Sequence, residues 1–221
     1  MSFLHRRGVV LSAVALTLSG AEAARAETKD VPCTDIFPFL LNYLNLPAAE
    51  RTHFRLAYRL SVTGARLSDV KLVLKHNGET PLGVAADNTL TPLPPVAALK
   101  AKAPVTVTRP DGSKIGLNLL IAAALPPATA YAAPDLKKAV DQAHAGAKKA
   151  AGVMSLAVPN LDRIVFVGAS GGQAVAADGK AAALPKSKDG HPVFEPAAHS
   201  TAARVTLDKT PTLLRIDARS K

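Results

Sequence analysis

Apolar and polar residues alternate in several short segments of the chain, and this pattern predicts β-strands. Residues 55–62 place four apolar side chains on one side, namely Leu56, Tyr58, Leu60 and Val62. Residues 115–121 do the same with Ile115, Leu117, Leu119 and Ile121. A period of two is typical of a strand that buries one face in an antiparallel sheet. Further strands are expected at 70–75, 82–86, 105–108, 153–158, 163–167, 173–177, 204–207 and 213–217.

Two segments have helical periodicity instead. Residues 35–46 carry apolar side chains at helical spacing, with Pro38 in the first turn and Pro47 at the end. Residues 134–151 begin with a proline and are followed by Gly152, a residue type common just after a helix. The apolar face of this second helix is mostly alanine, so it buries little area, and we expect it to lie on a sheet.

A repeated motif indicates how these elements are organised. The run KLVLKHNGETPLGVAADNTLTPLP begins at Lys71, and RIVFVGASGGQAVAADGKAAALP begins at Arg163; their VAAD sequences are 91 residues apart. A later pair, Val105-Thr106-Val107 and Val205-Thr206-Leu207, matches at a distance of 100. Turn sequences such as Asn77-Gly78 and Asp111-Gly112 favour hairpins between the strands. Chance similarity in an alanine-rich chain is the alternative.

The repeat predicts an α+β, mainly β fold made of two tandem related modules. Each module is expected to be a short helix followed by a mostly antiparallel meander or sandwich-like sheet. The first module covers residues 27–125 and the second residues 134–221. The Pro- and Ala-rich residues 126–133 are expected to be a linker.

The N-terminus has the features of an export signal. Arg6 and Arg7 precede an uncharged apolar stretch at 9–18, and Ala24-Arg25-Ala26 offers small residues at a cleavage site. The stretch is shorter than the roughly 20 residues of a membrane-spanning helix. We therefore expect residues 1–26 to be a signal peptide and the mature protein to be periplasmic or secreted. The arginine pair resembles a twin-arginine signal, and ordinary secretion is the alternative.

Charge and composition narrow the partners. The full chain has a net charge of +10, and removal of residues 1–26 leaves +8. This excess favours an anionic partner, although the basic residues are scattered. The chain has no tryptophan and 4% aromatic residues, which argues against nucleic-acid binding by base stacking. Cys33 is the only cysteine, so it is expected either to be buried or to pair between chains.

One stretch suggests catalysis. Gly168-Ala169-Ser170-Gly171-Gly172 follows an apolar run and matches the Gly-x-Ser-x-Gly turn that exposes a nucleophilic serine in α/β-hydrolases. Asp178, Asp189, His191 and His199 follow in the order that a Ser170 triad needs. However, the hydrolase turn must lead into a helix, and another turn begins six residues after Gly172. A small serine hydrolase is thus the alternative to a non-catalytic protein.

Metal and cofactor motifs are absent from the sequence. His53, His76 and His144 are isolated, and no histidine pair has zinc-ligand spacing with cysteine partners. There is no phosphate-binding loop, dinucleotide fingerprint or haem-attachment motif. No metal site and no cofactor are expected.

The loop at 186–204 is the candidate binding segment. It is nine residues longer than its counterpart after the first copy of the repeat. Long loops on a sheet scaffold frequently carry binding groups, and a tolerated insertion is the alternative. We expect this loop to contact an anionic or polar component of the cell envelope, through Lys186, Lys188, His191 and Phe194.

The strand-turn-strand rhythm, the Asp-Asn or Asp-Gly turn and the following Leu-Pro give a family resemblance. In these features the chain resembles secreted proteins of Gram-negative bacteria that are grouped as a domain of unknown function. The resemblance implies an exported β-rich protein and brings no catalytic residues. The sequence as a whole favours an exported soluble envelope protein with a non-catalytic binding or structural role.

Overall fold

The computed structural model describes residues 26–219, so the expected signal peptide lies outside the described residues except for Ala26. The first half contains β1 (Ala26–Pro32), α1 (Cys33–Ile36), α2 (Leu40–Leu44), β2 (Phe54–Thr63), β3 (Lys71–Lys75), β4 (Glu79–Pro81), β5 (Gly83–Val84), β6 (Leu90–Thr91), α3 (Val96–Lys100), β7 (Pro104–Pro110) and β8 (Lys114–Ala123). The second half contains β9 (Ala130–Ala132), α4 (Ala133–Ala151), β10 (Leu161–Val167), β11 (Gly172–Ala176), β12 (Ala181–Ala183), β13 (Val193–Phe194), β14 (Ala202–Leu207) and β15 (Leu213–Ala218). Short 3-10 helices lie at η1 (Ala48–Arg51), η2 (Leu67–Asp69) and η3 (Gly152–Ala157). Strands outweigh helices and all strand pairing is antiparallel, which confirms the mainly β, α+β class.

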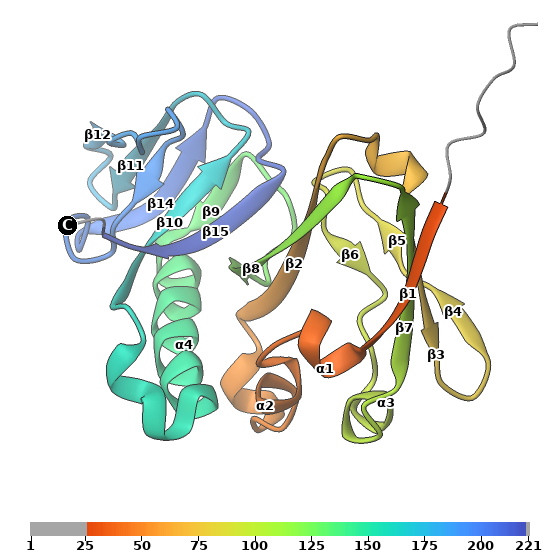
Figure 1. The fold of residues 1–221 in the computed structure, drawn as a ribbon. Helices are drawn as coiled ribbons and strands as arrows, with labels where there is room; N and C mark the ends of the chain where they lie inside the picture. The colour runs from red at the N-terminus through yellow and green to blue at the C-terminus, as the bar shows by residue number, and fades with distance from the viewer. Residues whose placement is uncertain (1–25, 220–221) are drawn as a thin grey trace, which may run out of the picture.

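A central sheet joins the two halves. Its strand order is β13-β10-β15-β8-β2, so β10 and β15 of the second half continue into β8 and β2 of the first. The link between the halves is the pairing of Arg215 in β15 with Ala122 in β8. Each half also has an outer sheet, β1-β7-β3-β4 in the first and β12-β11-β14-β9 in the second. Figure 1 shows the two halves side by side, with α4 standing beneath the central strands.

The longest strand pair is β2 with β8. Ten residues of each strand are paired, from Phe54 with Ala123 to Thr63 with Lys114. This register places the predicted apolar faces opposite one another, with Leu60 across from Leu117, because directly paired residues share a face of the sheet. The alternation in the sequence therefore predicted both the strands and the face that they bury.

Helix α4 packs on strands from both halves. Its buried side includes Leu136, Ala139, Val140 and Ala143, and it contacts β2 and β8 as well as β10 and β14. Gly146 is the point of closest approach to β2. A Cβ atom there would lie 2.5 Å from Cζ of Phe54 and 3.3 Å from Cδ1 of Leu46, so only glycine fits.

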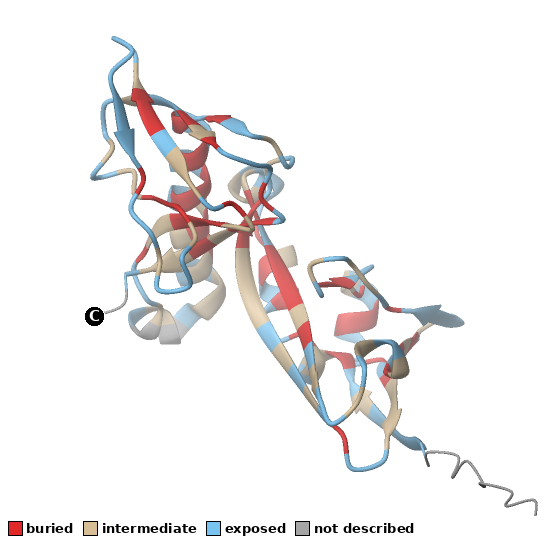
Figure 2. Ribbon diagram, turned by 90° about the horizontal axis from the view of Figure 1, so that it is seen from above, coloured by how far each residue is buried: buried red, intermediate tan, exposed pale blue. Residues whose placement is uncertain are grey.

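Aromatic side chains fill the core of each half. Tyr58 stands edge-on to Phe37 with ring centroids 5.0 Å apart, and Tyr43 is edge-on to Phe54 at 5.3 Å. In the second half Tyr131 of β9 stacks on Phe166 of β10 at 5.9 Å. Figure 2 shows buried residues along α4 and the central strands.

Cys33 is also part of the core. Its Sγ donates a hydrogen bond of 3.4 Å to the carbonyl oxygen of Ala98, and burial raises the pKa of the thiol above its ordinary value. The expectation that this thiol is buried is confirmed.

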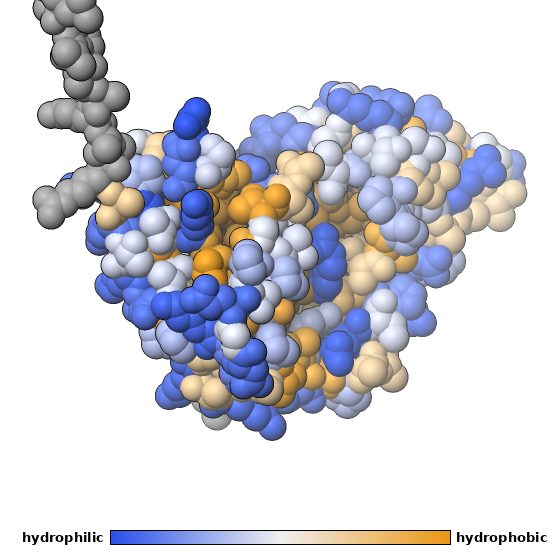
Figure 3. All heavy atoms as spheres, turned by 90° about the vertical axis from the view of Figure 1, so that its right-hand side faces the viewer, coloured by the Kyte–Doolittle hydropathy of each residue, from blue (hydrophilic) through white to orange (hydrophobic). Residues whose placement is uncertain are grey.

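The first half leaves part of its apolar interior open. Between β1, α1 and β8 lies a groove of about 640 Å³ whose apolar wall includes Leu60, Leu72, Val107 and Leu117. Figure 3, which faces this half of the molecule, shows hydrophobic residues in the hollows between hydrophilic ones.

The prediction of a single helix at 35–46 is wrong. The structure has two short helices there, α1 and α2. The residue before a proline is disfavoured in the helical region, and Phe37, which precedes Pro38, takes φ −116° and ψ 65°. Phe39 then has a φ of +63° before α2 begins.

Three further predictions are corrected. The strand expected at 153–158 is the 3-10 helix η3. Asp111-Gly112 connects β7 to β8 without closing a hairpin, because these strands belong to different sheets. Part of the expected linker at 126–133 is β9, which pairs with β14.

The two halves have corresponding strand orders. The order β4-β3-β7-β1 in the first outer sheet matches the order β12-β11-β14-β9 in the second. In the central sheet β2 corresponds to β10, and β8 corresponds to β15. Val105 is paired with Val31 on one side and with Leu74 on the other. The residues a hundred positions later are paired in the same way, because Val205 lies between Tyr131 and Ala174. The tandem-module interpretation itself stays a prediction.

The alignment that suggested the repeat is wrong in detail. Val84 lies in β5, whereas Val175 lies in β11, so the VAAD copies occupy different places in the strand order. Asp87 caps the β5–β6 turn by accepting from the backbone N–H of Thr89, and Asp178 caps the β11–β12 turn by accepting from that of Lys180. Each half also has a strand before its helix, β1 before α1 and β9 before α4, which the predicted order of helix then sheet lacked.

The contact at Gly146 predicts a destabilising substitution. Gly146→Val should lower the free energy of unfolding by about 1–3 kcal/mol, because the new side chain must displace the buried ring of Phe54. Ala145→Val, on the exposed side of the same turn, should cost only about 0.5 kcal/mol of helix propensity. Urea denaturation followed by circular dichroism measures both, and equal losses would contradict the close packing.

Candidate binding site

Ser170 does not lie in a nucleophile turn. It occupies a turn between β10 and β11, where its backbone N–H donates a 3.0 Å hydrogen bond to Oδ1 of Asp208. Strand β11 begins at Gly172, so the helix that the hydrolase geometry requires is replaced by a strand. The match to Gly-x-Ser-x-Gly is therefore a sequence coincidence in a strand-turn-strand connection.

The two histidines proposed as partners of Ser170 contact backbone carbonyls instead. Nδ1 of His191 lies 3.3 Å from the carbonyl oxygen of Ala169, and Nδ1 of His199 lies 3.0 Å from that of Glu195. The ring of His199 also stacks on Phe194 with centroids 5.5 Å apart. Among residues 26–219 no hydrogen bond joins either ring to Ser170, so the serine–histidine hydrogen bond of a triad is not formed in this structure.

Phe194 is not an exposed anchor, and this correction changes the meaning of the loop. Its side chain is 2% exposed, and with Val193 it forms β13, which pairs with Val165 and Ile164 of β10. The supposed insertion thus supplies an edge strand of the central sheet. Sequence reasoning missed this strand because it has two residues and its pairing is long-range.

Lys186 and Lys188 lie on the exposed part of the loop. Lys186 forms a β-bridge with Pro192, and a tight turn closes where the N–H of Ser187 donates to the carbonyl oxygen of His191. The predicted role of the two lysines toward an anionic partner stays a prediction.

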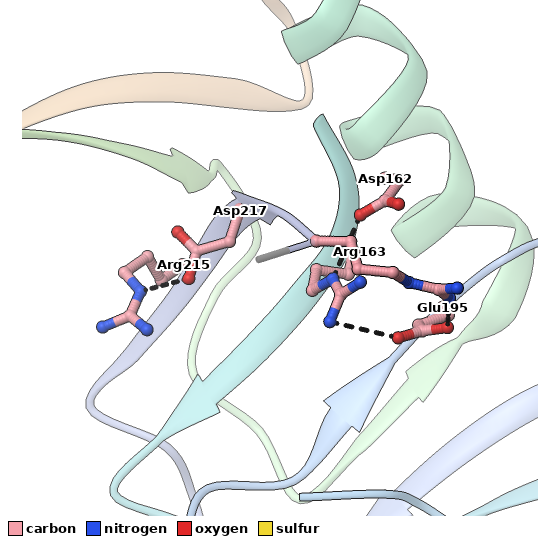
Figure 4. A network of polar contacts seen from close by, with 6 residues as sticks. Asp162, Arg163, Glu195, Arg215 and Asp217 are labelled. Atoms are coloured by element: carbon pink, nitrogen blue, oxygen red, sulfur yellow. Dashed lines mark hydrogen bonds and ion pairs between the residues drawn. The ribbon is translucent and has the colours of Figure 1, made fainter. Parts of the chain in front are cut away.

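A partly buried ionic network connects the same loop to β10. Arg163 donates from Nε to Asp162 at 3.0 Å and pairs through Nη1 with Glu195 at 3.2 Å, and Glu195 is also paired with Arg219. The side chains of Arg163 and Glu195 are only 16% and 14% exposed. Figure 4 shows Glu195 between the two guanidinium groups, with Arg215 and Asp217 forming a separate pair nearby. Breaking such a pair leaves a charge uncompensated, so the network fixes the end of β13.

A large cavity lies mostly in the first half, and none of the predicted site residues lines it. Its volume is about 860 Å³. Helix α2 forms one wall, the β5–β6 hairpin and residues 93–96 form the other, and β2 forms the floor. The walls are largely apolar and include Leu40, Leu44, Leu90, Leu93 and Val96.

The floor of the cavity is the uncovered edge of β2. Leu60 donates its N–H to the carbonyl oxygen of Asn88, away from β8, and β6 reaches β2 only at the bridge between Thr89 and Arg59. Because hydrogen-bonding direction alternates along an antiparallel strand, the backbone polar groups of Leu56 point to the same edge as those of Leu60. They therefore face the cavity, where a ligand or water can bond to them.

One end of the cavity is positively charged. Arg55 lines it, and within the described residues Arg55 has no carboxylate partner. Tyr43 stands beside it, with its hydroxyl donating to the carbonyl oxygen of Phe54 at 3.0 Å and the guanidinium of Arg51 5.7 Å from its ring centroid. Burial raises the pKa of Tyr43, and the nearby charges of Arg51 and Arg55 oppose that rise.

The other end of the cavity carries Asp87. Its Oδ1 accepts hydrogen bonds from the N–H of Thr89 at 3.0 Å and from the hydroxyl of the same residue at 2.6 Å. Both donors belong to one buried threonine, so these hydrogen bonds stabilise the β5–β6 hairpin. Within the described residues the cavity therefore combines apolar walls with one arginine, Arg55, that has no carboxylate partner.

No metal site accompanies the cavity. In the described range no group of three or more His, Cys, Asp or Glu residues is arranged to hold a metal ion. Nor does any helix between residues 26 and 219 have the length and apolar character needed to cross a membrane.

The reassignment of the loop predicts unequal effects of two substitutions within it. Phe194→Ala should lower the free energy of unfolding by about 3–5 kcal/mol, because it empties a core position. Lys188→Ala, on the exposed turn of the same loop, should change it by less than about 0.5 kcal/mol. A thermal or urea melt of each variant gives the comparison, and a small loss for Phe194→Ala would restore the view of a tolerated insertion.

The chain was compared with family models, curated proteins and solved structures. None of the three comparisons gave a match. The residues that line the cavity are therefore the basis for the ligand class proposed below.

Proposed function

We propose that the protein is an exported, non-catalytic binding protein of the cell envelope whose cavity takes a small amphiphilic anion. The observation that supports this most directly is the combination of apolar walls with Arg55, whose guanidinium has no carboxylate partner within the described residues. Ligand sites in proteins are usually clefts of about 300–1,000 Å³ with a few polar groups that fix orientation. The cavity has this size and this distribution of polar groups.

The chemistry of the lining defines the ligand class. An alkyl or aromatic body would pack between α2 and residues 93–96, where leucine and proline side chains exclude water. A carboxylate, sulfonate or phosphate would lie against Arg55, whose charged hydrogen bonds are worth more than neutral ones. The backbone N–H of Leu56 would then donate, or its C=O would accept, one further hydrogen bond.

Export is the second part of the proposal. It rests on the arginine pair, the apolar stretch and the small residues at 24–26, of which only Ala26 belongs to the described residues. An anionic or polar envelope component remains the proposed partner class, and the positive net charge of the chain supports it.

Paired fluorescent probes test the binding site. The anionic apolar dye 1-anilinonaphthalene-8-sulfonate should bind with fluorescence enhancement, and Arg55→Gln should weaken its affinity about tenfold, because a charged hydrogen bond is lost. The neutral dye Nile red should bind the Arg55→Gln variant as well as the original protein. Leu93→Trp should weaken the binding of both dyes, because the larger side chain takes up part of the cavity.

Arg204→Gln is the matched control, because Arg204 is exposed on β14 of the other half. It should leave both titrations unchanged. Should Arg55→Gln and Leu93→Trp each leave dye binding as it was, the cavity is not the ligand site and the proposal fails.

A further inference from the structure

The two large apolar side chains that are exposed in the described chain lie at the same end of the molecule. Phe39 is 50% exposed and Leu156 is 99% exposed. Phe39 precedes α2 and faces the last turns of α4, and Leu156 belongs to η3, which follows α4 and packs back against it. Figure 1 shows η3, the C-terminal end of α4, α2 and α3 in that order along the lower end of the molecule.

The fold holds Phe39 in a conformation that presents its ring outward. Its φ of +63° lies in the left-handed region, which a bulky residue rarely adopts. The neighbouring backbone is fixed on both sides: the carbonyl oxygen of Pro38 accepts from the Tyr58 hydroxyl at 2.6 Å, and that of Phe39 accepts from the N–H of Tyr43 at 2.9 Å. Strain that is maintained in this way tends to mark a functional position.

Behind Phe39 an apolar groove opens between α4 and the central sheet. Its volume is about 320 Å³. Ala147 and Ala150 of α4 line it with small side chains, and Leu119 and Ile121 of β8 line it from the sheet. A groove of this kind matches an alkyl chain, which needs no hydrogen-bond partner.

Three exposed lysines lie on α3, directly after it and on α4, at the same end of the molecule. Lys148 lies in the last turn of α4, Lys100 ends α3 and Lys102 follows it; all three are exposed. Within residues 26–219 none of the three has a carboxylate partner, whereas Lys149 is paired with Glu50 at 2.6 Å. We call the surface made by Phe39, Leu156, Lys100, Lys102 and Lys148 the basal face.

We propose that the basal face docks on an anionic lipid surface. Phe39 and Leu156 enter the acyl region, an acyl chain occupies the groove beside Gly146, and the three lysines lie among the headgroups. Stable attachment of a protein to a bilayer surface needs both apolar insertion and basic charge, and the basal face has both. This inference goes beyond the proposed ligand binding and does not depend on the cavity.

A second copy of the chain fits the basal face less well than a lipid surface does. A two-fold interface brings the same patch together from both chains, so the unpaired lysines would meet like charges. Two apolar side chains and one small groove also offer far less than the roughly 800 Å² that each partner buries in a standard interface.

Vesicle binding tests the inference on the protein as the cell delivers it, with its N-terminus determined by sequencing. Co-sedimentation is measured with phosphatidylcholine vesicles and with vesicles in which a third of the lipid is phosphatidylglycerol. We expect the protein to bind the anionic vesicles at least tenfold more tightly than the neutral ones and to be released by salt. The variant Phe39→Ala with Leu156→Ala should lower binding to anionic vesicles about tenfold, because both inserted side chains are lost.

A charge-matched pair of variants locates the surface. Lys100→Gln with Lys148→Gln should weaken binding to anionic vesicles about tenfold, whereas Lys186→Gln with Lys188→Gln removes the same charge from the exposed loop and should leave it unchanged. Both variants should show the circular dichroism spectrum and melting curve of the original protein. Residues 1–25 are common to all variants, so any contribution from them cancels.

Three results would overturn the inference. One is equal affinity for neutral and anionic vesicles. Another is a loss of binding only in the variant of the exposed loop. The third is a concentration-dependent dimer in size-exclusion chromatography that disappears in Phe39→Ala with Leu156→Ala, which would assign the basal face to a second copy. Loss of dye binding in the cavity variants leaves the vesicle result unaffected, so the two proposals fail separately.

Discussion

The pairing of β8 with β15, together with the packing of α4 across it, holds the two halves in one structure. The strand contact is short, with Arg215 and Ala122 as its paired residues. Helix α4 reinforces it by burying Leu136 and Val140 against the second half while Gly146 lies against Phe54 of the first. Buried apolar area is the main stabilising contribution in folding, and here that area is shared between the halves. Neither half would keep its core if the other unfolded.

The two outer edges of the central sheet differ between the halves. In the second half β13 covers β10 with Val193 and Phe194, and the partly buried pair of Arg163 and Glu195 closes the space beyond it. In the first half β6 reaches β2 only at Thr89, and the chain then turns away through residues 93–96. The cavity is the space that this departure leaves. Strand orders that correspond in the two halves thus give one closed edge and one open edge, and the proposed ligand site is at the open one.

Local patterns predicted the local structure well. Alternation identified β2 and β8 together with their buried faces, because a period of two is set by the strand itself. The long helix at 134–151 was recognised from its proline start and the glycine after its end, and α4 covers Ala133–Ala151. Prediction failed at Pro38, where the steric effect of the proline on Phe37 divided the expected helix.

Features that depend on distant contacts were not predictable. The VAAD copies align at a distance of 91 residues because turn chemistry recurs, whereas the strand register around Val105 and Val205 follows a distance of 100. The sequence placed Phe194 in a surface loop because its partner strand is about 30 residues away in the chain. Hydrophobic periodicity reports only local structure and does not reveal such a distant partner. The cavity escaped detection for the same reason, since α2, β2 and residues 93–96 meet only in the folded chain.

The central claim is that the two halves form one cooperative unit through the central sheet and α4. Native-state hydrogen exchange at increasing urea concentration, resolved by mass spectrometry of peptides, tests it most directly. The account predicts that amides of β2 and β8 and amides of β10 and β15 approach the same opening free energy with the same dependence on urea. If the strands of one half opened while those of the other stayed protected, the halves would be independent domains, and the claim would be contradicted.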